Sequence, residues 1–157
     1  MTPDETYMRL AIRLAQKSVD ENLGGPFGCV IVKDGRIVGE GFNQVTTTND
    51  PTAHAEVVAI RNACQNLGSF QLAGCSIYTS CEPCPMCLGA IYWARFRHIY
   101  YGNTRAEAAA IGFDDDHIYR EIGIDPGKRS IPATQLRPPG TDVPFAEWLK
   151  KPDKIRY

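Results

Sequence analysis

Two short segments, thirty residues apart, constrain the fold and the function of this chain more than any other feature of its sequence. The first contains His54 and Glu56, and the second contains Cys84 and Cys87 within the run Pro-Cys-Pro-Met-Cys. One imidazole and two thiols are three strong ligands for zinc. Three protein ligands leave one tetrahedral position open to water, which is typical of a catalytic site rather than a structural one. A chain that uses this set must bring the two segments together.

Both segments are predicted to lie at the N-terminal ends of helices. The run 53–67 follows turn residues and precedes a glycine, as helices commonly do. Prolines flank Cys84, and they suit the start of a second helix over 84–93. Cys84 and Cys87 would then share one helical face, with about 5–6 Å between their Cβ atoms. The positive end of the helix dipole favours the thiolate form that a metal needs.

Glu56 is predicted to carry protons. The charges of a zinc ion, two thiolates and a neutral imidazole cancel, so a hydroxide bound there would be a nucleophile ready to attack an electrophilic carbon. A carboxylate two residues from His54 can accept the proton of the water and pass it to a substrate. A structural zinc site would have four protein ligands and no need for this carboxylate.

Each of these residues alone has a simpler interpretation. His54 could be an ordinary helix-start residue, and Glu56 an acid favoured by the helix dipole. A single C-x-x-C pair could be redox-active, structural or inert. The spacing of Cys81, Cys84 and Cys87 also resembles the opening of an iron–sulfur motif, but the next position of that motif holds isoleucine and no cysteine follows. The combination is therefore more specific than its parts.

Length and composition predict one compact domain. A chain of 157 residues can bury a core of its own. The net charge of −1 is unfavourable for binding a phosphate backbone, which usually takes a basic face, so no nucleic-acid partner is expected, although a local basic patch could be hidden by the average. No apolar run is long enough for a bilayer, and the polar, acidic N-terminus does not resemble a signal peptide, so no membrane partner is expected. Six cysteines without an export signal indicate reduced thiols and a cytoplasmic location.

Strands and helices are predicted to alternate along the chain. A capping box at residues 2–5 starts a helix that stops near residues 24–25, and Asp34-Gly35 between two β-rich runs predicts a hairpin. The other expected elements are a helix over 53–67, a strand over 76–79, a helix over 84–93, a strand over 98–102, and helices over 104–111 and 145–150. Residues 112–143 are expected to be irregular, with short helical pieces. This alternation predicts an α/β sheet covered by helices.

The chain resembles the cytidine deaminase superfamily throughout its first 110 residues, and within it the small bacterial-type guanine deaminases. The pattern H-x-E…P-C-x-x-C is the signature of zinc-dependent nucleobase deaminases. The matching segments are residues 24–28, 49–56, 79–94 and 112–115, together with the terminal Tyr157. The resemblance implies a three-layer cytidine deaminase-like fold, with a mixed central sheet of about five strands sandwiched by helices. It also implies one domain over 1–157, in which 144–157 form a C-terminal helix and a lid.

The resemblance assigns the zinc chemistry to the residues already singled out. His54, Cys84 and Cys87 would bind one Zn2+ per chain, and Glu56 would be the proton shuttle. Asn43 would hydrogen-bond the purine, because an amide offers both a donor and an acceptor. The alternative for Asn43 is an ordinary turn residue.

Four further residues receive roles from the resemblance alone. Phe27 would lie against the base and Trp93 would close the floor of the pocket, although both could simply pack in the core. Asp115 would accept hydrogen bonds from the guanine amino group and help it leave, although an Asp-rich run can also cap the next helix. Tyr157 would belong to the lid, and its alternative is a frayed chain end.

The implied reaction is the hydrolysis of guanine to xanthine and ammonia. The implied protein binds a small purine base and forms a homodimer, in which the C-terminal segments could be exchanged between subunits. Two alternatives stay open. One is a deaminase of the same superfamily that acts on cytosine or on adenosine in tRNA, and such a tRNA enzyme should have a basic surface. The other is not an enzyme but a binding module with a structural zinc.

Overall fold

The computed structural model describes residues 2–157. Contacts group the chain into two compact units, one that extends to Asp116 and one from His117 to Tyr157. The first unit contains the whole sheet and the helices that cover it. The second contains most of one short helix, a 3₁₀ turn and the C-terminal helix.

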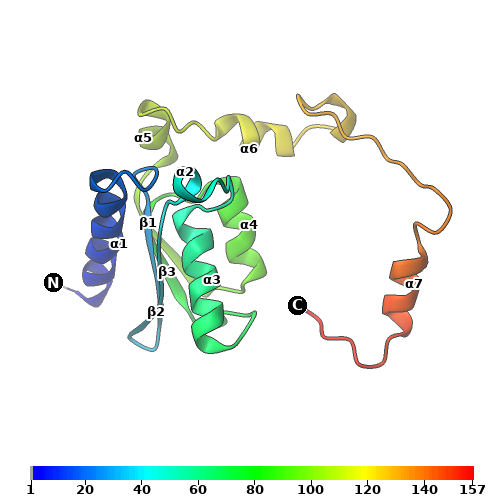
Figure 1. Ribbon diagram of the computed structural model, residues 1–157, viewed down its shortest axis with the longest axis horizontal. Coiled ribbons are helices and arrows are strands. Elements are labelled where there is room, and N and C mark those ends of the chain that lie inside the picture. Colours follow the sequence, from blue (N-terminus) through cyan, green and yellow to red (C-terminus); the bar gives the residue numbers. More distant parts are fainter. Residues whose placement is uncertain (1) are drawn as a thin grey trace. The chain divides into compact units, whose positions relative to one another are not determined.

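A mixed sheet forms the centre of the first unit (Figure 1). The strands are β1 (Gly28–Lys33), β2 (Arg36–Phe42), β3 (Ser76–Cys81) and β4 (His98–Asn103). They follow the order β2-β1-β3-β4, in which β1 pairs antiparallel with β2 and with β3, and β3 pairs parallel with β4. The predicted α/β fold with a mixed sheet is confirmed. The sheet has four strands within residues 2–157, fewer than expected, because the chain after β4 continues only as helices and irregular segments.

The predicted hairpin joins β1 to β2. Asp34 and Gly35 form its turn with φ angles of 48° and 75°. Two successive positive φ angles are the geometry of a tight two-residue hairpin, for which Asp-Gly is a preferred sequence.

Helices cover both faces of the sheet (Figure 1). Helix α1 (Pro3–Asp20) covers one face, and α3 (Ala55–Leu67) and α4 (Pro85–Trp93) cover the other. Alternate residues of β1 serve the two faces, as the two-residue period of a strand requires: Val30 packs in the cluster on the α1 side, and Ile31 in the one under α3. The predicted three-layer arrangement is therefore confirmed.

Two glycines of β2 let α3 approach the sheet closely. A Cβ atom at Gly41 would lie 2.3 Å from the carbonyl oxygen of Ala55, and one at Gly39 would lie 2.6 Å from that of Ala59. Any side chain at these positions would push the helix outward. The close approach matters for the site, because Ala55 follows His54 directly and precedes Glu56.

The remaining helices are short. They are α2 (Val45–Thr48), α5 (Arg105–Ala110), α6 (Asp116–Ile122), the 3₁₀ helix η1 (Pro126–Lys128) and α7 (Val143–Lys150). The capping box predicted for α1 is present at Thr2 and Glu5, and Thr104 and Glu107 form a second one on α5. Helix α2 was not anticipated from the sequence. None of the helices within residues 2–157 combines the length and the apolar character that a membrane crossing requires.

Candidate metal centre and active site

The structure brings His54, Cys84 and Cys87 together. The Nδ1 atom of His54 lies 3.5 Å from the Sγ atom of Cys84 and 3.5 Å from that of Cys87. The possible ligand atoms of the three residues all lie within 4.8 Å of one another. One small cation can therefore be reached by one nitrogen and two sulfurs at once, as the spacing predicted.

Two helix starts produce this arrangement. His54 is the N-cap of α3 and Cys84 is the N-cap of α4, and both have extended backbone conformations. They therefore stand immediately before the helices rather than in the first turns, where the sequence had suggested they would lie. The proline after Cys84 explains the difference for α4, since it drives the preceding residue out of the helical region. Cys87 lies in the first turn of α4, and its Sγ atom joins the cluster with His54 and Cys84.

The electrostatics of the cluster fit a divalent cation. Hydrogen bonds from Cys87 and His54 lower the pKa of Cys84 to about 4, so the chain itself stabilises one thiolate. The adjacent Cys84 group and burial raise the pKa of Cys87 well above its usual value. A second thiolate thus requires additional positive charge, which a zinc ion supplies. The donor set of one imidazole and two thiols fits one zinc ion per chain.

Glu56 lies directly beside this cluster and is only 6% exposed. Its Oε2 atom is 3.4 Å from the Sγ atom of Cys87, and its Oε1 atom is 3.2 Å from the Oγ1 atom of Thr79. Burial raises the pKa of the Glu56 carboxyl group. A raised pKa is the direction that favours proton uptake by a carboxyl group, as proton transfer requires.

Asn43 is buried where the chain leaves β2. Its Oδ1 atom accepts hydrogen bonds from the backbone N–H groups of Gly25 and Val45, at 3.1 and 3.2 Å. These two bonds set the orientation of the amide, so Nδ2 is the atom left to donate to a ligand. Asn43 therefore holds the turn after β2, as its alternative interpretation predicted, and its Nδ2 group can still donate a hydrogen bond to a ligand.

Phe27 packs both on the core and on a second aromatic ring. It contacts the hydrophobic cluster under α3, and its ring meets Phe113 edge to face, with 4.9 Å between the ring centroids. Gly25, whose N–H bonds to Asn43, lies against both rings. The pair thus forms an aromatic wall beside the loop that holds Asn43.

The three consecutive aspartates have different surroundings. Asp114 is exposed and accepts a hydrogen bond from the backbone N–H of Asp116, which begins α6. Asp115 is more enclosed, with 18% of its side chain exposed and its Oδ1 atom 3.6 Å from Nε of Arg105. Burial raises the pKa of Asp115, the Arg105 guanidinium opposes this rise, and the Cys84 group adds a smaller increase.

The structure does not bring Trp93 to the cluster. Trp93 is the last residue of α4, whereas Cys84 precedes the first, so about 13 Å of helix separates them. Its side chain is 63% exposed and faces the guanidinium of Arg95. Tyr157 ends the second unit and is exposed.

Sequence reasoning missed three residues of this region. Thr79 contacts Glu56, Arg105 pairs with Asp115, and Phe113 packs on Phe27. Thr79 could have been suspected, because the period of a strand places it on the same face as Ile77, toward α3. Phe113 lies in the segment 112–115 that carries the resemblance, but no role was assigned to it, and the pairing of Arg105 with Asp115 is set by a tertiary contact.

The chain is similar to known deaminases along most of its length. The sequence model described as the cytidine and deoxycytidylate deaminase zinc-binding region matches residues 1–103. The guanine deaminase of Bacillus subtilis is 53% identical over 98% of both chains, and a crystal structure of a guanine deaminase from that organism superposes with a TM-score of 0.95 over the same shares. A tRNA-specific adenosine deaminase of Haemophilus influenzae is 40% identical, over 79% of this chain and 75% of the other.

The superfamily resemblance is thus confirmed by both sequence and fold. The matched region contains the imidazole, the two thiols and the carboxylate described above. This chain belongs to the cytidine and deoxycytidylate deaminase family of zinc-binding proteins.

Proposed function

We propose that this chain catalyses the zinc-dependent hydrolytic deamination of guanine, which yields xanthine and ammonia. The observation that carries the proposal is the extent of the similarity to guanine deaminase, which covers 98% of both sequences at 53% identity. This similarity continues past residue 103, where the zinc-binding region ends. The match to the tRNA-specific enzyme covers 79% of the chain at lower identity. Guanine is therefore favoured over tRNA adenosine and cytosine, and an enzyme is favoured over a binding module.

His54, Cys84 and Cys87 hold the zinc ion. When bound, the ion supplies an activated water as the nucleophile for the reaction. The role of the chain is to keep these three ligands in place. It does so because the N-terminal ends of α3 and α4, which carry the ligands, lie side by side. No fourth protein ligand accompanies them in the cluster that residues 2–157 form, so a position remains for the water.

Glu56 moves the protons. Its carboxylate accepts a proton from the attacking water, delivers it to the ring nitrogen adjacent to C2 of guanine, and then assists protonation of the departing amine. Its position beside Cys87 supports this role, because the carboxylate is then within reach of whatever stands on the cluster. Its burial excludes bulk water, which would otherwise compete for the proton.

Asn43 and Phe27 bind the base. Nδ2 of Asn43 donates a hydrogen bond to an acceptor on the edge of the purine, while the Phe27 ring lies against its face. The fixed orientation of the Asn43 amide supports the assignment, because a preorganised donor loses little entropy on binding.

Asp115 receives the amino group of guanine. Its carboxylate accepts hydrogen bonds from this group and helps it leave as ammonia. The ion pair with Arg105 supports this assignment, because it keeps the carboxylate from turning toward solvent. Asp114 is not given the role, since its side chain is used at the start of α6.

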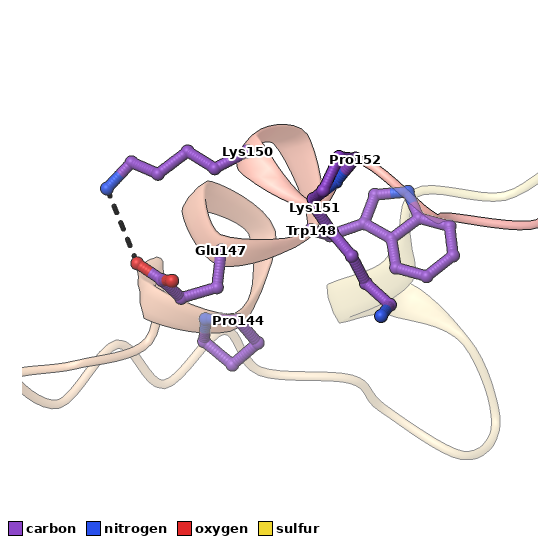
Figure 2. A pocket seen from close by; sticks show the side chains of 6 residues that line it. All are labelled: Pro144, Glu147, Trp148, Lys150, Lys151 and Pro152. Atoms are coloured by element: carbon purple, nitrogen blue, oxygen red, sulfur yellow. Dashed lines mark hydrogen bonds and ion pairs between the residues drawn. The ribbon is translucent and has the colours of Figure 1, made fainter.

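Residues 144–157 act as a lid within one functional domain. Helix α7 carries strongly exposed apolar side chains, including Phe145 at 80% and Leu149 at 74%, which supports docking on another surface. A pocket of about 430 Å³ lies on this helix beside the ring of Trp148 (Figure 2). We assign the exposed apolar side chains of α7 to the interface of a homodimer, in which the C-terminal segments can be exchanged between subunits. Tyr157 would then close over the substrate.

The enzyme acts on a free purine base in the cytoplasm. All six cysteines in the described chain are free thiols, which supports a reducing compartment. Partners other than a small-molecule base and a second subunit are not needed for the proposed reaction.

A substrate panel tests the proposal. Purified protein with zinc is incubated with guanine, guanosine, cytosine, cytidine, adenine, adenosine and a tRNA, and ammonia release is measured. We expect guanine to give the highest kcat/KM, because a lid formed by the tail leaves no room for a ribose. A preference for cytosine, for adenosine or for a tRNA would contradict the substrate assignment while leaving the zinc chemistry in place.

A further inference from the structure

Thr79 lies in the middle of the sheet and faces the proposed proton carrier. It belongs to β3, it is 1% exposed, and it pairs in register with Cys29 of β1. Its side chain is on the same face of the strand as Ile77, which packs under α3. Thr79 touches none of the proposed metal ligands in the hydrogen bonds that the structure records, so its contact with Glu56 has to be explained separately.

The hydroxyl of Thr79 has two acceptors within reach. Its Oγ1 atom is 3.2 Å from Oε1 of Glu56 and 3.0 Å from the carbonyl oxygen of Cys81. A hydroxyl has one hydrogen and can also accept one, so it can serve the two groups in different ways. The rigid backbone of β3 fixes the position of this hydroxyl relative to α3.

Glu56 has a second side-chain contact on its other oxygen. Oε2 of Glu56 accepts from the Sγ–H of Cys87 at 3.4 Å. Thr79 and Cys87 thus contact opposite oxygens of the carboxylate, Thr79 from β3 and Cys87 from α4. Of these two recorded partners within residues 2–157, Thr79 is the one that is not a proposed metal ligand, so its contact with the carboxylate does not depend on the state of the cluster.

We propose that Thr79 is a positioning residue for the reaction: its hydroxyl holds Oε1 of Glu56, so that the other carboxylate oxygen stays directed at the His54–Cys84–Cys87 cluster. This inference rests on the proposed function of Glu56. A carboxylate that is free to rotate would spend less time in the geometry for proton transfer, and general acid–base catalysis depends on that geometry.

Replacement of the hydroxyl tests the proposal. Thr79→Val keeps the shape of the side chain and removes the hydroxyl, and Thr79→Ala serves as a second variant in case valine impairs folding. Thr79→Ser keeps the hydroxyl. Ser80→Ala is the matched control, since it removes a buried hydroxyl from the same strand that contacts the backbone of Gly28 instead of Glu56.

We expect Thr79→Val to lower kcat for guanine by about 10–100-fold, the usual range for residues that orient a metal site's reacting groups. KM, zinc content and melting temperature should stay close to those of Ser80→Ala, and Thr79→Ser should restore most of kcat. In a crystal structure of zinc-bound Thr79→Val, the Glu56 carboxylate should be rotated from its wild-type position.

Three results would overturn the inference. They are a wild-type kcat in both Thr79→Val and Thr79→Ala, no recovery in Thr79→Ser, or loss of zinc from Thr79→Val, which would make Thr79 a support of the metal site instead. Failure of the proposed function is distinguishable, because the unaltered protein would then release no ammonia from guanine.

Discussion

The Sγ atom of Cys87 lies 3.4 Å from Oε2 of Glu56, so the proposed proton carrier is in direct contact with a proposed metal ligand. The two residues are 31 positions apart and belong to different helices. Because Glu56 lies in the first turn of α3 and Cys87 in the first turn of α4, the Glu56 side chain reaches Cys87 directly. The roles of the metal site and of the acid–base group can therefore be separated by substitutions at neighbouring positions.

Zinc binding should depend on the two cysteines of α4. A Cys84→Ala, Cys87→Ala double variant should fall from one zinc per chain to almost none, because one imidazole alone cannot retain the ion. Metal content is measured on protein purified without added zinc. Cys64→Ala is the control for the loss of a thiol outside the cluster, and it should keep its zinc. Full occupancy in the double variant would contradict the ligand assignment.

Glu56→Gln should separate metal binding from catalysis. The amide has nearly the same shape as the carboxylate but cannot carry a proton, so kcat should fall by at least about 10²–10⁴-fold while zinc content and folding are kept. Steady-state kinetics and metal analysis measure the two effects. Glu40→Gln, an exposed position on β2, should leave kcat unchanged. Near-normal turnover in Glu56→Gln would mean that another group transfers the protons.

Asp115 and Asp114 should differ sharply in their effects. Asp115→Asn removes a charged acceptor for the amino group, which is worth about 2 kcal/mol and hence about 30-fold in kcat/KM for guanine. Asp114→Asn keeps a side-chain oxygen for the backbone N–H of Asp116 and should change kcat/KM little. Equal losses in the two variants would show that the run acts through α6 rather than through contact with the substrate.

The tail should be needed for turnover but not for folding. Deletion of residues 153–157 leaves α7 intact and removes Tyr157, so the melting temperature and the zinc content should be preserved while guanine deamination falls sharply. Sedimentation measures whether the truncated protein keeps the dimer. Full activity after truncation would show that Tyr157 is only a chain end, and that the lid proposal fails.

Local signals in the sequence predicted much of the fold. Caps, turns and apolar periodicity located α1, the β1–β2 hairpin, α3 and α4, because each depends on residues close together in the chain. The convergence of His54, Cys84 and Cys87 was predictable as well, since metal ligation demands it of any chain that uses this set.

Tertiary contacts explain what the sequence did not reveal. The number of strands could not be predicted from short segments of the sequence, because it depends on whether the chain after β4 returns to the sheet. The contact of Thr79 with Glu56 depends on which helix covers that face of β3, and the position of Trp93 depends on the direction in which α4 runs from Cys84.

The most direct test of the account is the conversion of guanine in water enriched in oxygen-18, followed by mass spectrometry of the product. Hydrolytic deamination predicts one xanthine and one ammonia for each guanine consumed, with one oxygen-18 atom at C2 of the xanthine, and no conversion after zinc has been removed by a chelator. Absence of xanthine, or xanthine that carries no label, would contradict the claim that this chain is a zinc-dependent guanine deaminase.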